Sequence, residues 1–292
     1  MQYACMPLIT PFDPWQSSLC TCPKKLTLNP YTGCDHKCVY CYAQTYIPRF
    51  SECRPKKDLL KRLAHEAAAL KGQTISLSNS SDPYPRMEKE AGLTRECLRI
   101  LGKSSCRIQI ITKSTLVARD ADILREAPAT AALTITTADD DVAEIIEPNA
   151  PKPSERLKTV ETLVQKGITV TVRVDPVIPF VNDDNAELIG KIADLGVKHV
   201  TVSTYKARSR DWRRFAAVLP SAAEKLKPLY WSRGERANGC VLLPRDFRLK
   251  LLSDVRSSAL RCGLEFAVCR EGLSHLNTAV CDGSWLLPKV AR

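Results

Sequence analysis

The sequence predicts an α/β fold, a partial (β/α)6 barrel that carries a helical, basic C-terminal extension. Three observations support this prediction. Short runs rich in Ile, Val and Thr alternate with helical apolar periods, six such units precede the basic segment that begins at residue 205, and 292 residues with 44% hydrophobic content suffice for one large core. Strands that alternate with helices favour βαβ units and therefore a parallel sheet.

The expected strands are short, rich in β-branched residues and bounded by turn residues. They cover residues 25–28, 74–78, 107–112, 132–136, 168–174, 198–204 and 264–268.

Helices are expected where apolar residues recur every three or four positions. Ser154 can cap the second of them, and Gly167, Gly196 and Gly263 follow the last three, as glycine often does after a helix. The expected helices cover residues 57–71, 154–165, 184–195 and 244–262.

We expect three regions: an N-terminal extension with a cysteine pair (residues 1–24), the barrel core (25–205), and a basic helical segment with the final strand and further cysteines, packed on the barrel (206–292). No apolar run approaches the length that crosses a membrane, and the first residues lack a signal-peptide pattern. The expected location is therefore the cytoplasm, with no membrane partner.

The most informative motif is Cys-x3-Cys-x2-Cys, formed by Cys34, Cys38 and Cys41. A 4Fe–4S cluster has four irons, so three thiolates leave one iron open to an exchangeable ligand. The alternative is a zinc site completed by Cys20, Cys22 or a distant ligand. Zinc sites usually combine Cys-x2-Cys with a second pair of ligands at similar spacing, and nothing downstream supplies that pair.

This spacing, with Tyr40 just before the last cysteine, resembles the signature of radical S-adenosylmethionine (radical SAM) enzymes. The resemblance implies a TIM-like partial barrel, a 4Fe–4S cluster on the three cysteines, and SAM bound to the open iron, with Tyr40 beside the cluster or the adenine. The cysteine loop follows the first expected strand, and parallel β/α barrels place their working residues after the C-terminal ends of strands.

Four further segments resemble one subgroup of the family, the spore photoproduct lyase-like (DNA-repair-photolyase-like) proteins. Together with the cysteine loop they extend the resemblance over residues 20–205. The segments are 78–85, 111–114 with Arg119-Asp120, Glu147-Pro148 with Arg156, and 175–179.

The resemblance implies a SAM site at these strand ends. The Ser80 and Ser81 hydroxyls could bind the SAM ammonium or ribose, Asp82 the ammonium, Lys113 the carboxylate or oxygens near the sulfonium, and Thr136 the ribose. Each also has a structural interpretation: Asp82 begins a turn that Ser80 can cap, Lys113 can be solvated, and Thr136 is a good strand residue.

Asn79, Arg173 and Asp175 also lie at strand ends and could line the substrate side of the site. For Arg173 and Asp175 the alternative is a structural ion pair inside the barrel mouth.

Four other cysteines, Cys20, Cys22, Cys269 and Cys281, could meet as a second site if the last strand returns to the cluster side. Such a site could hold zinc or an auxiliary iron–sulfur cluster. Otherwise they are reduced bystanders, or Cys269 acts alone as a hydrogen-atom donor.

One departure from the subgroup concerns this donor. Spore photoproduct lyases carry a cysteine in the segment after the second strand, whereas residues 78–81 here contain no thiol. Either Cys269 or Tyr84 supplies the hydrogen atom, or the substrate differs. The remaining cysteines are expected to be buried apolar residues: Cys5, Cys53, Cys97, Cys106, Cys240 and Cys262.

The net charge is +11, and residues 205–261 hold fourteen Lys or Arg against five Asp or Glu. Such a segment could bind phosphates, and its aromatic residues could stack on bases. The alternative is a set of amphipathic helices with solvated basic faces and aromatics in the core. The aromatics concerned are Tyr205, Trp212, Phe215, Tyr230 and Trp231.

The function expected from these features is a radical SAM enzyme that abstracts a hydrogen atom from a nucleic acid or a damaged base. A peptide or small-molecule substrate is the alternative, and a non-catalytic zinc or iron–sulfur nucleic-acid-binding protein is the alternative of another class. The expected partners are DNA or RNA and a reductant such as ferredoxin or flavodoxin.

Overall fold

The computed structural model describes residues 7–13, 17–78 and 80–288. Its centre is one eight-stranded sheet of order β1-β2-β5-β6-β7-β8-β9-β12, in which β1 is antiparallel to β2 and every other pair is parallel. The strands are β1 Thr10–Pro11, β2 Leu26–Leu28, β5 Lys71–Leu77, β6 Ser105–Thr112, β7 Ala129–Thr134, β8 Val170–Val177, β9 His199–Thr204 and β12 Glu265–Val268.

The edges β1 and β12 do not pair with each other, so the sheet is an open, partial barrel and the predicted fold class is confirmed. All seven expected strands exist within a few residues of their predicted limits. The last of them, β12, lies beside β9 and makes a seventh parallel strand, so the C-terminal region contributes to the barrel sheet itself.

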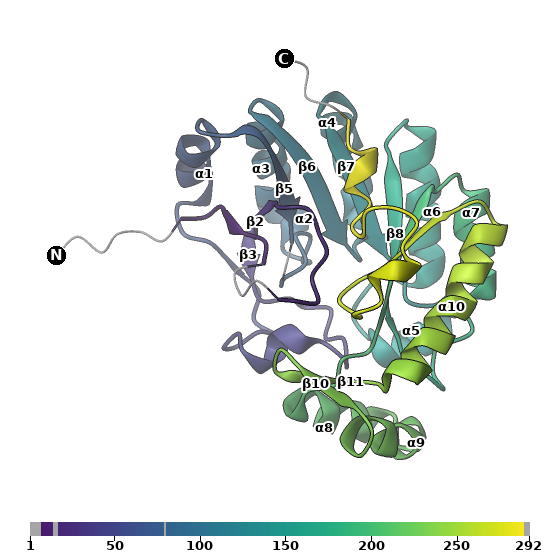
Figure 1. The fold of residues 1–292 in the computed structure, drawn as a ribbon. Helices are drawn as coiled ribbons and strands as arrows, with labels where there is room; N and C mark the ends of the chain where they lie inside the picture. Colours follow the sequence, from purple (N-terminus) through teal and green to yellow (C-terminus); the bar gives the residue numbers. More distant parts are fainter. Residues whose placement is uncertain (1–6, 14–16, 79, 289–292) are drawn as a thin grey trace.

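Six helices cover the outer, convex face of the sheet (Figure 1). They are α1 Leu59–Ala67, α3 Leu93–Gly102, α4 Ala121–Glu126, α6 Pro153–Gln165, α7 Ala186–Asp194 and α10 Arg245–Arg261. The other elements include α2 Glu88–Ala91, α5 Asp140–Ile146, α8 Ser209–Val218, α9 Pro220–Trp231, the hairpin β10 Glu235–Ala237 and β11 Cys240–Leu242, and the pair β3 Tyr31–Thr32 and β4 Arg54–Pro55. No helix among the described residues is long and apolar enough to span a bilayer.

The two faces of the sheet differ in chemistry because side chains alternate along each strand. On β8, Val170, Val172 and Val174 belong to the core shared with the helices, whereas Arg173 and Asp175 face the concave side and line a cavity there. The apolar face therefore holds the fold together, and the polar face is free for chemistry.

One detail of the expected helices is wrong. Ser154 does not cap α6, because the helix begins one residue earlier at Pro153, with Lys152 as the N-cap. Proline is well suited to the first helical position because its φ is already helical and it has no N–H to satisfy. The Ser154 hydroxyl instead donates to Asp140 Oδ2 at 2.6 Å.

Four of the five aromatic residues of the basic segment pack against one another rather than facing solvent, whereas Trp231 at the end of α9 is 37% exposed. Tyr205, Phe215 and Tyr230 are 0–2% exposed, and Trp212 lies over Phe215 and Tyr230 with ring centroids 5.5 Å apart. The expectation that they stack on bases is therefore wrong for these rings. They form the apolar core between α8 and α9, as amphipathic helices require.

The segment after β12 runs back across the concave face (yellow in Figure 1). Lys25 Nζ pairs with Asp282 Oδ2 at 2.6 Å, Gln109 donates to the Asp282 carbonyl at 2.7 Å, and the Thr201 hydroxyl donates to the Cys281 carbonyl at 2.9 Å. These three partners come from the β2 end, β6 and β9. The C-terminal segment therefore spans the interior of the open barrel.

Candidate active site

A cavity of about 340 Å³ opens at the C-terminal ends of the strands. Cys34, Cys38 and Cys41 line it, so all three cysteines of the loop motif face one space. Arg173 and Asp175 line the same space and form an ion pair at 2.6 Å, so the ion pair is confirmed and their role on the substrate side stays a prediction. Asn79 lies outside the described residues.

The cysteine loop enters through a backbone position that only glycine fits. Gly33 has φ +90°, and a Cβ there would lie 2.5 Å from the Phe50 carbonyl oxygen and 2.7 Å from that of Glu52. The next residue, Cys34, donates its N–H to the Phe50 carbonyl at 2.8 Å. The loop is thereby pressed against the segment before β4.

The far side of the loop is held by the basic segment and the α5 end. Arg214 donates to the carbonyls of Val39 at 2.9 Å and Cys41 at 3.2 Å, and Val39 N–H donates to the Ile146 carbonyl at 2.9 Å. The loop conformation therefore rests on backbone contacts that do not require the thiols, which stay directed to the cavity.

Burial raises the pKa of the Cys38 thiol to about 12, although the charge of Lys113 opposes the shift. Burial also raises the pKa of Cys34 and of Cys41. Burial disfavours the thiolate form, so a metal bound here must stabilise the deprotonated thiolates with its positive charge.

The donor set of the loop suits an iron–sulfur cluster, because such clusters are held by cysteine thiolates and three thiolates leave one iron of a 4Fe–4S cluster open. Among the described residues, the ligand atoms of Cys34, Asp35 and His36 also lie within 4.8 Å of one another.

Two of the expected SAM residues already have protein partners. The Ser81 hydroxyl accepts from Gly33 N–H at 3.0 Å. The Asp82 carboxylate accepts from the Thr112 hydroxyl at 2.7 Å and from Lys113 N–H at 2.8 Å, and it lies 3.7 Å from His36 Nδ1. Both residues therefore fasten the loop after β5 to the cysteine loop and to β6, and their contact with SAM stays a prediction.

Lys113 extends into the cavity with its ammonium close to a buried carboxylate. Its Nζ lies 3.8 Å from Glu147 Oε1 and 5.7 Å from the centre of the Tyr40 ring. A lysine has three donors. Lys113 and Ser80, which also line the cavity, are the expected SAM residues best placed to reach a ligand.

Glu147 is the centre of a buried network that sequence analysis noted only as part of the family resemblance. It accepts hydrogen bonds from the Tyr40 hydroxyl and from the Thr136 hydroxyl, the latter at 3.0 Å, and pairs with Arg156. Thr136 is fully buried and Thr134 lines the cavity in its place, so the predicted contact of Thr136 with ribose stays a prediction.

The charge state of Glu147 follows from its neighbours. Burial alone would raise its pKa, but the charges of Arg156 and Lys113 and the Tyr40 hydrogen bond outweigh burial and lower the pKa to about 2. The carboxylate therefore stays ionised at neutral pH and fixes the Tyr40 ring behind the cysteine loop.

The two proposed hydrogen donors lie in different surroundings. Cys269 lines the cavity, with Arg173 hydrogen-bonded to its side chain, so it can reach a ligand there. Tyr84 is 2% exposed, belongs to the apolar core and is not part of the cavity wall. The structure thus favours Cys269 over Tyr84 on position alone.

Within the second cysteine group, Cys22 Sγ and Cys281 Sγ are 3.2 Å apart, and both Cys22 and Cys269 line the cavity. A metal site formed by these three with Cys20 stays a prediction. Sequence analysis placed this meeting as one of several alternatives, because no local pattern fixes it.

Of the cysteines expected to be buried and apolar, Cys97 and Cys106 are fully buried, as predicted. The expectation is wrong for Cys262, which is exposed at the end of α10, and for Cys240, which is half-buried on β11 and lines the cavity. Cys53 is half-buried beside the Gly33 carbonyl, and Cys5 lies outside the described residues. The hairpin that places Cys240 gave no clear strand signal in the sequence.

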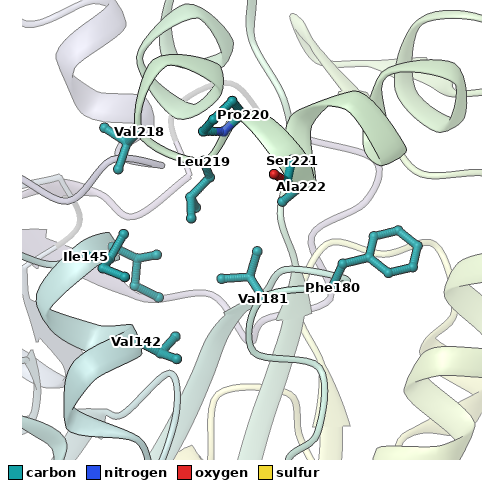
Figure 2. Close-up of a pocket in the computed structure, with 10 residues that line it drawn as sticks. Val142, Ile145, Phe180, Val181, Val218, Leu219, Pro220, Ser221 and Ala222 are labelled. Carbon is teal, nitrogen blue, oxygen red and sulfur yellow. The ribbon is translucent and has the colours of Figure 1, made fainter.

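A second hollow, of about 310 Å³, lies between α5 and the α8–α9 junction. Figure 2 shows Val142 and Ile145 facing Val218 and Leu219 across it, with Phe180 at one side. The lining is apolar apart from Ser221 and shares no residue with the cysteine cavity. The chemistry of the molecule is therefore assigned to the cysteine cavity.

The fold and the site define a partial-barrel protein with a three-thiolate loop at the C-terminal ends of its strands. The chain belongs to the radical SAM superfamily, whose family model matches residues 28–192. The protein is therefore a radical SAM enzyme, and the family implies a 4Fe–4S cluster and SAM as its cofactors.

The chain is also similar to two uncharacterized relatives and to several solved structures. An uncharacterized protein of Mycobacterium tuberculosis (strain ATCC 25618 / H37Rv) is 28% identical over 231 residues, 71% of this chain and 68% of that protein. An uncharacterized protein of Methanocaldococcus jannaschii is 31% identical over 166 residues, 54% of this chain and 62% of that protein.

Among solved structures, spore photoproduct lyase in complex with a dinucleoside spore photoproduct matches with a TM-score of 0.64 at 17% identity, covering 82% of this chain and 74% of that chain. SuiB of Streptococcus suis bound to S-adenosylmethionine matches with a TM-score of 0.55 at 15% identity, covering 83% of this chain and 49% of that chain. At these identities the similarity concerns the fold.

Proposed function

We propose that the chain binds a 4Fe–4S cluster through Cys34, Cys38 and Cys41, cleaves SAM reductively, and abstracts a hydrogen atom from a nucleic acid or a damaged base. The observation that carries this proposal is the convergence of three loop thiols on one cavity that also receives Lys113. When bound, the cluster supplies the electron that splits SAM into methionine and a 5′-deoxyadenosyl radical.

The residues of the chain then have distinct tasks. Lys113 offers a cationic donor for the SAM carboxylate, and Tyr40, fixed by Glu147, forms the wall behind the loop. The buried loop and the closed concave face exclude water from a radical that would otherwise react with the wrong C–H bond.

Two observations support an anionic, nucleotide-containing substrate. Six Lys or Arg residues and three Asp residues line the cavity, and one of these cations, Arg208, donates among the described residues only to the backbone carbonyls of Gly239 and Asn238, so its charge is available to an anionic ligand. The fold is similar to that of spore photoproduct lyase, whose structure contains a dinucleoside lesion. The cations are Lys25, Lys113, Arg173, Lys206, Arg208 and Arg270.

A reductant such as ferredoxin or flavodoxin is part of the proposal, because the cluster needs an external electron. The exposed face of α8 lies beside the cysteine loop, since Arg210 donates to the Thr45 carbonyl at 3.1 Å. Its basic side chains offer a docking surface for an acidic electron carrier.

The test is anaerobic reconstitution with iron and sulfide, followed by EPR spectroscopy with and without SAM. We expect a 4Fe–4S signal that changes on adding SAM, and release of 5′-deoxyadenosine under reductant. Cys97→Ala, a core cysteine away from the cavity, is the matched control for Cys-to-Ala changes in the loop. A colourless protein with one zinc and no response to SAM would instead identify a binding module.

The substrate class needs a separate measurement. The candidate substrates are oligonucleotides, including damaged ones, and peptides. In one experiment they are unlabelled and SAM is deuterated at its 5′ carbon. In the other the substrates are deuterated, and the measurement is the passage of deuterium into 5′-deoxyadenosine. Transfer from a nucleic acid supports the proposal. Transfer only from a peptide or a small molecule would assign the alternative substrate class.

A further inference from the structure

The four cysteines outside the loop motif come from three separate segments of the chain. Cys20 and Cys22 precede β2, Cys269 follows β12, and Cys281 lies in the C-terminal segment. The sheet is open between its β1 edge and its β12 edge (Figure 1), and Cys22 and Cys269 line the cavity on its concave side.

A direct contact and a shared cavity relate these thiols. Cys22 Sγ lies 3.2 Å from Cys281 Sγ. Cys20 is two residues before Cys22, and Cys269 lines the same cavity as Cys22. This proximity argues against the alternative that the four cysteines are unrelated, reduced residues.

Each segment is fixed in place by contacts that do not involve sulfur. The buried Lys25–Asp282 pair holds the Cys281 segment against the start of β2. Arg270 pairs with Asp13 at 3.1 Å and ties the end of β12 to the N-terminal segment. The cysteines are therefore brought together by the fold and do not depend on one another for their approach.

Cationic groups surround these thiols. Arg173 is hydrogen-bonded to the Cys269 side chain, Lys25 acts on Cys22, and Arg270 acts on Cys20 and Cys269. Such cations would offset the negative charge of four thiolates, as outer-shell partners do at metal centres.

The arrangement disfavours a disulfide, and its four cysteine sulfurs match the ligand set of an iron–sulfur cluster. The Cys22–Cys281 separation of 3.2 Å exceeds an S–S bond of about 2.05 Å, and such a bond would leave Cys20 and Cys269 unused. Iron–sulfur clusters of either common type take four thiolates.

We propose that Cys20, Cys22, Cys269 and Cys281 bind a second iron–sulfur cluster, whose irons are all held by the protein. Cys22 and Cys269 line the cavity that also contains Cys34, Cys38 and Cys41, so the second cluster borders the substrate space. It is placed to pass electrons to or from a substrate radical. In this site Cys269 is a ligand and not a free hydrogen donor.

The test separates the two groups of cysteines. In the triple variant Cys34→Ala/Cys38→Ala/Cys41→Ala, reconstituted anaerobically, we expect at least about two irons and matching sulfide per chain to remain, with an EPR signal that does not respond to SAM. Adding Cys22→Ser and Cys281→Ser removes that iron. Adding Cys97→Ala and Cys106→Ala instead, as the matched control, leaves it in place.

A second variant guards against misfolding of the triple variant. Cys22→Ser/Cys281→Ser with the loop cysteines intact is expected to lose the SAM-insensitive iron and keep the SAM-responsive signal. The inference is overturned if this double variant holds as much iron as the wild type, or if the group holds zinc or a disulfide. Because the function proposed above depends on the loop cysteines, its failure would appear in the SAM-responsive signal alone.

Discussion

The two cysteine groups of this protein differ in how the chain builds them. Cys34, Cys38 and Cys41 lie within one loop, and backbone contacts from neighbouring segments direct their thiols into the cavity. Cys20, Cys22, Cys269 and Cys281 depend on the fold of the whole sheet, with Cys281 brought to the start of β2 by the C-terminal segment. Cysteines within one loop can be recognised as a group from the sequence, whereas cysteines from separate segments are recognised as a group only in the folded structure.

The largest expected effect tests the local group. Cys38→Ala removes one thiolate from a site that has only three in the loop, and we expect 5′-deoxyadenosine release to fall below detection. The measurement is single-turnover product formation under reductant, with Cys97→Ala as the control. Turnover at the wild-type rate would contradict the assignment of the loop.

The Glu147→Gln change tests the buried network that holds Tyr40 behind the cysteine loop. This change leaves Arg156 buried without its carboxylate partner, and breaking one side of a buried pair costs about 3–5 kcal/mol. We expect a corresponding loss in the free energy of unfolding by denaturant titration. Glu144→Gln, an exposed residue on the same helix, is the matched control and should change stability little.

The same pair predicts a dependence on pH. The Glu147 pKa is lowered from an ordinary value of 4.5 to about 2, so its contribution to stability is complete above about pH 4.5 and is lost as the pH falls through about 2. We expect the stability gap between wild type and Glu147→Gln to narrow over this window. A gap that stays constant down to pH 2 would argue against an ionised Glu147.

A smaller effect is expected at Lys113. A hydrogen bond to a charged group contributes about 1.5–3 kcal/mol, so Lys113→Ala should weaken SAM binding about 10- to 150-fold while the iron content stays unchanged. Calorimetry on the reconstituted variant measures this. Arg107→Ala, near the start of β6 and away from Lys113, serves as the control. Unchanged SAM affinity would remove Lys113 from the site.

The smallest effect concerns the basic surface. Arg208 lines the cavity and Arg236 is exposed on the hairpin that contributes Asn238 and Cys240 to the wall. Arg208→Ala/Arg236→Ala should weaken oligonucleotide binding a few-fold and reduce the slope of affinity against salt, whereas Lys250→Ala on the exposed side of α10 should not. Equal effects from both would indicate a generally solvated basic face.

The same difference between local and assembled features explains which parts of the fold and site were predictable from the sequence. The strands were predictable because β-branched runs such as Val170–Val174 have one face in the core, and the loop motif because three ligands fit within eight residues. The network around Glu147 was noted only through a resemblance, since its partners Tyr40 and Arg156 lie on different segments.

Two expectations failed for the same physical reason. The aromatics of α8 and α9 were candidates for base stacking, and Cys240 was expected in the core, because their surroundings are decided by tertiary contacts. The sequence states which side chain is present, but the packing of the helices and of the β10–β11 hairpin decides whether that side chain faces the core, the cavity or solvent. Ser81 and Asp82 likewise have partners that no local pattern contains.

The path of the C-terminal segment has a consequence for synthesis on the ribosome. Lys25 is synthesised 257 residues before its buried partner Asp282. Until Asp282 has left the exit tunnel, the charge of Lys25 stays hydrated and the C-terminal segment cannot hold the start of β2. The barrel interior is therefore completed only after residue 282 is available, and a chain cut before Asp282 would leave the inner face open to water.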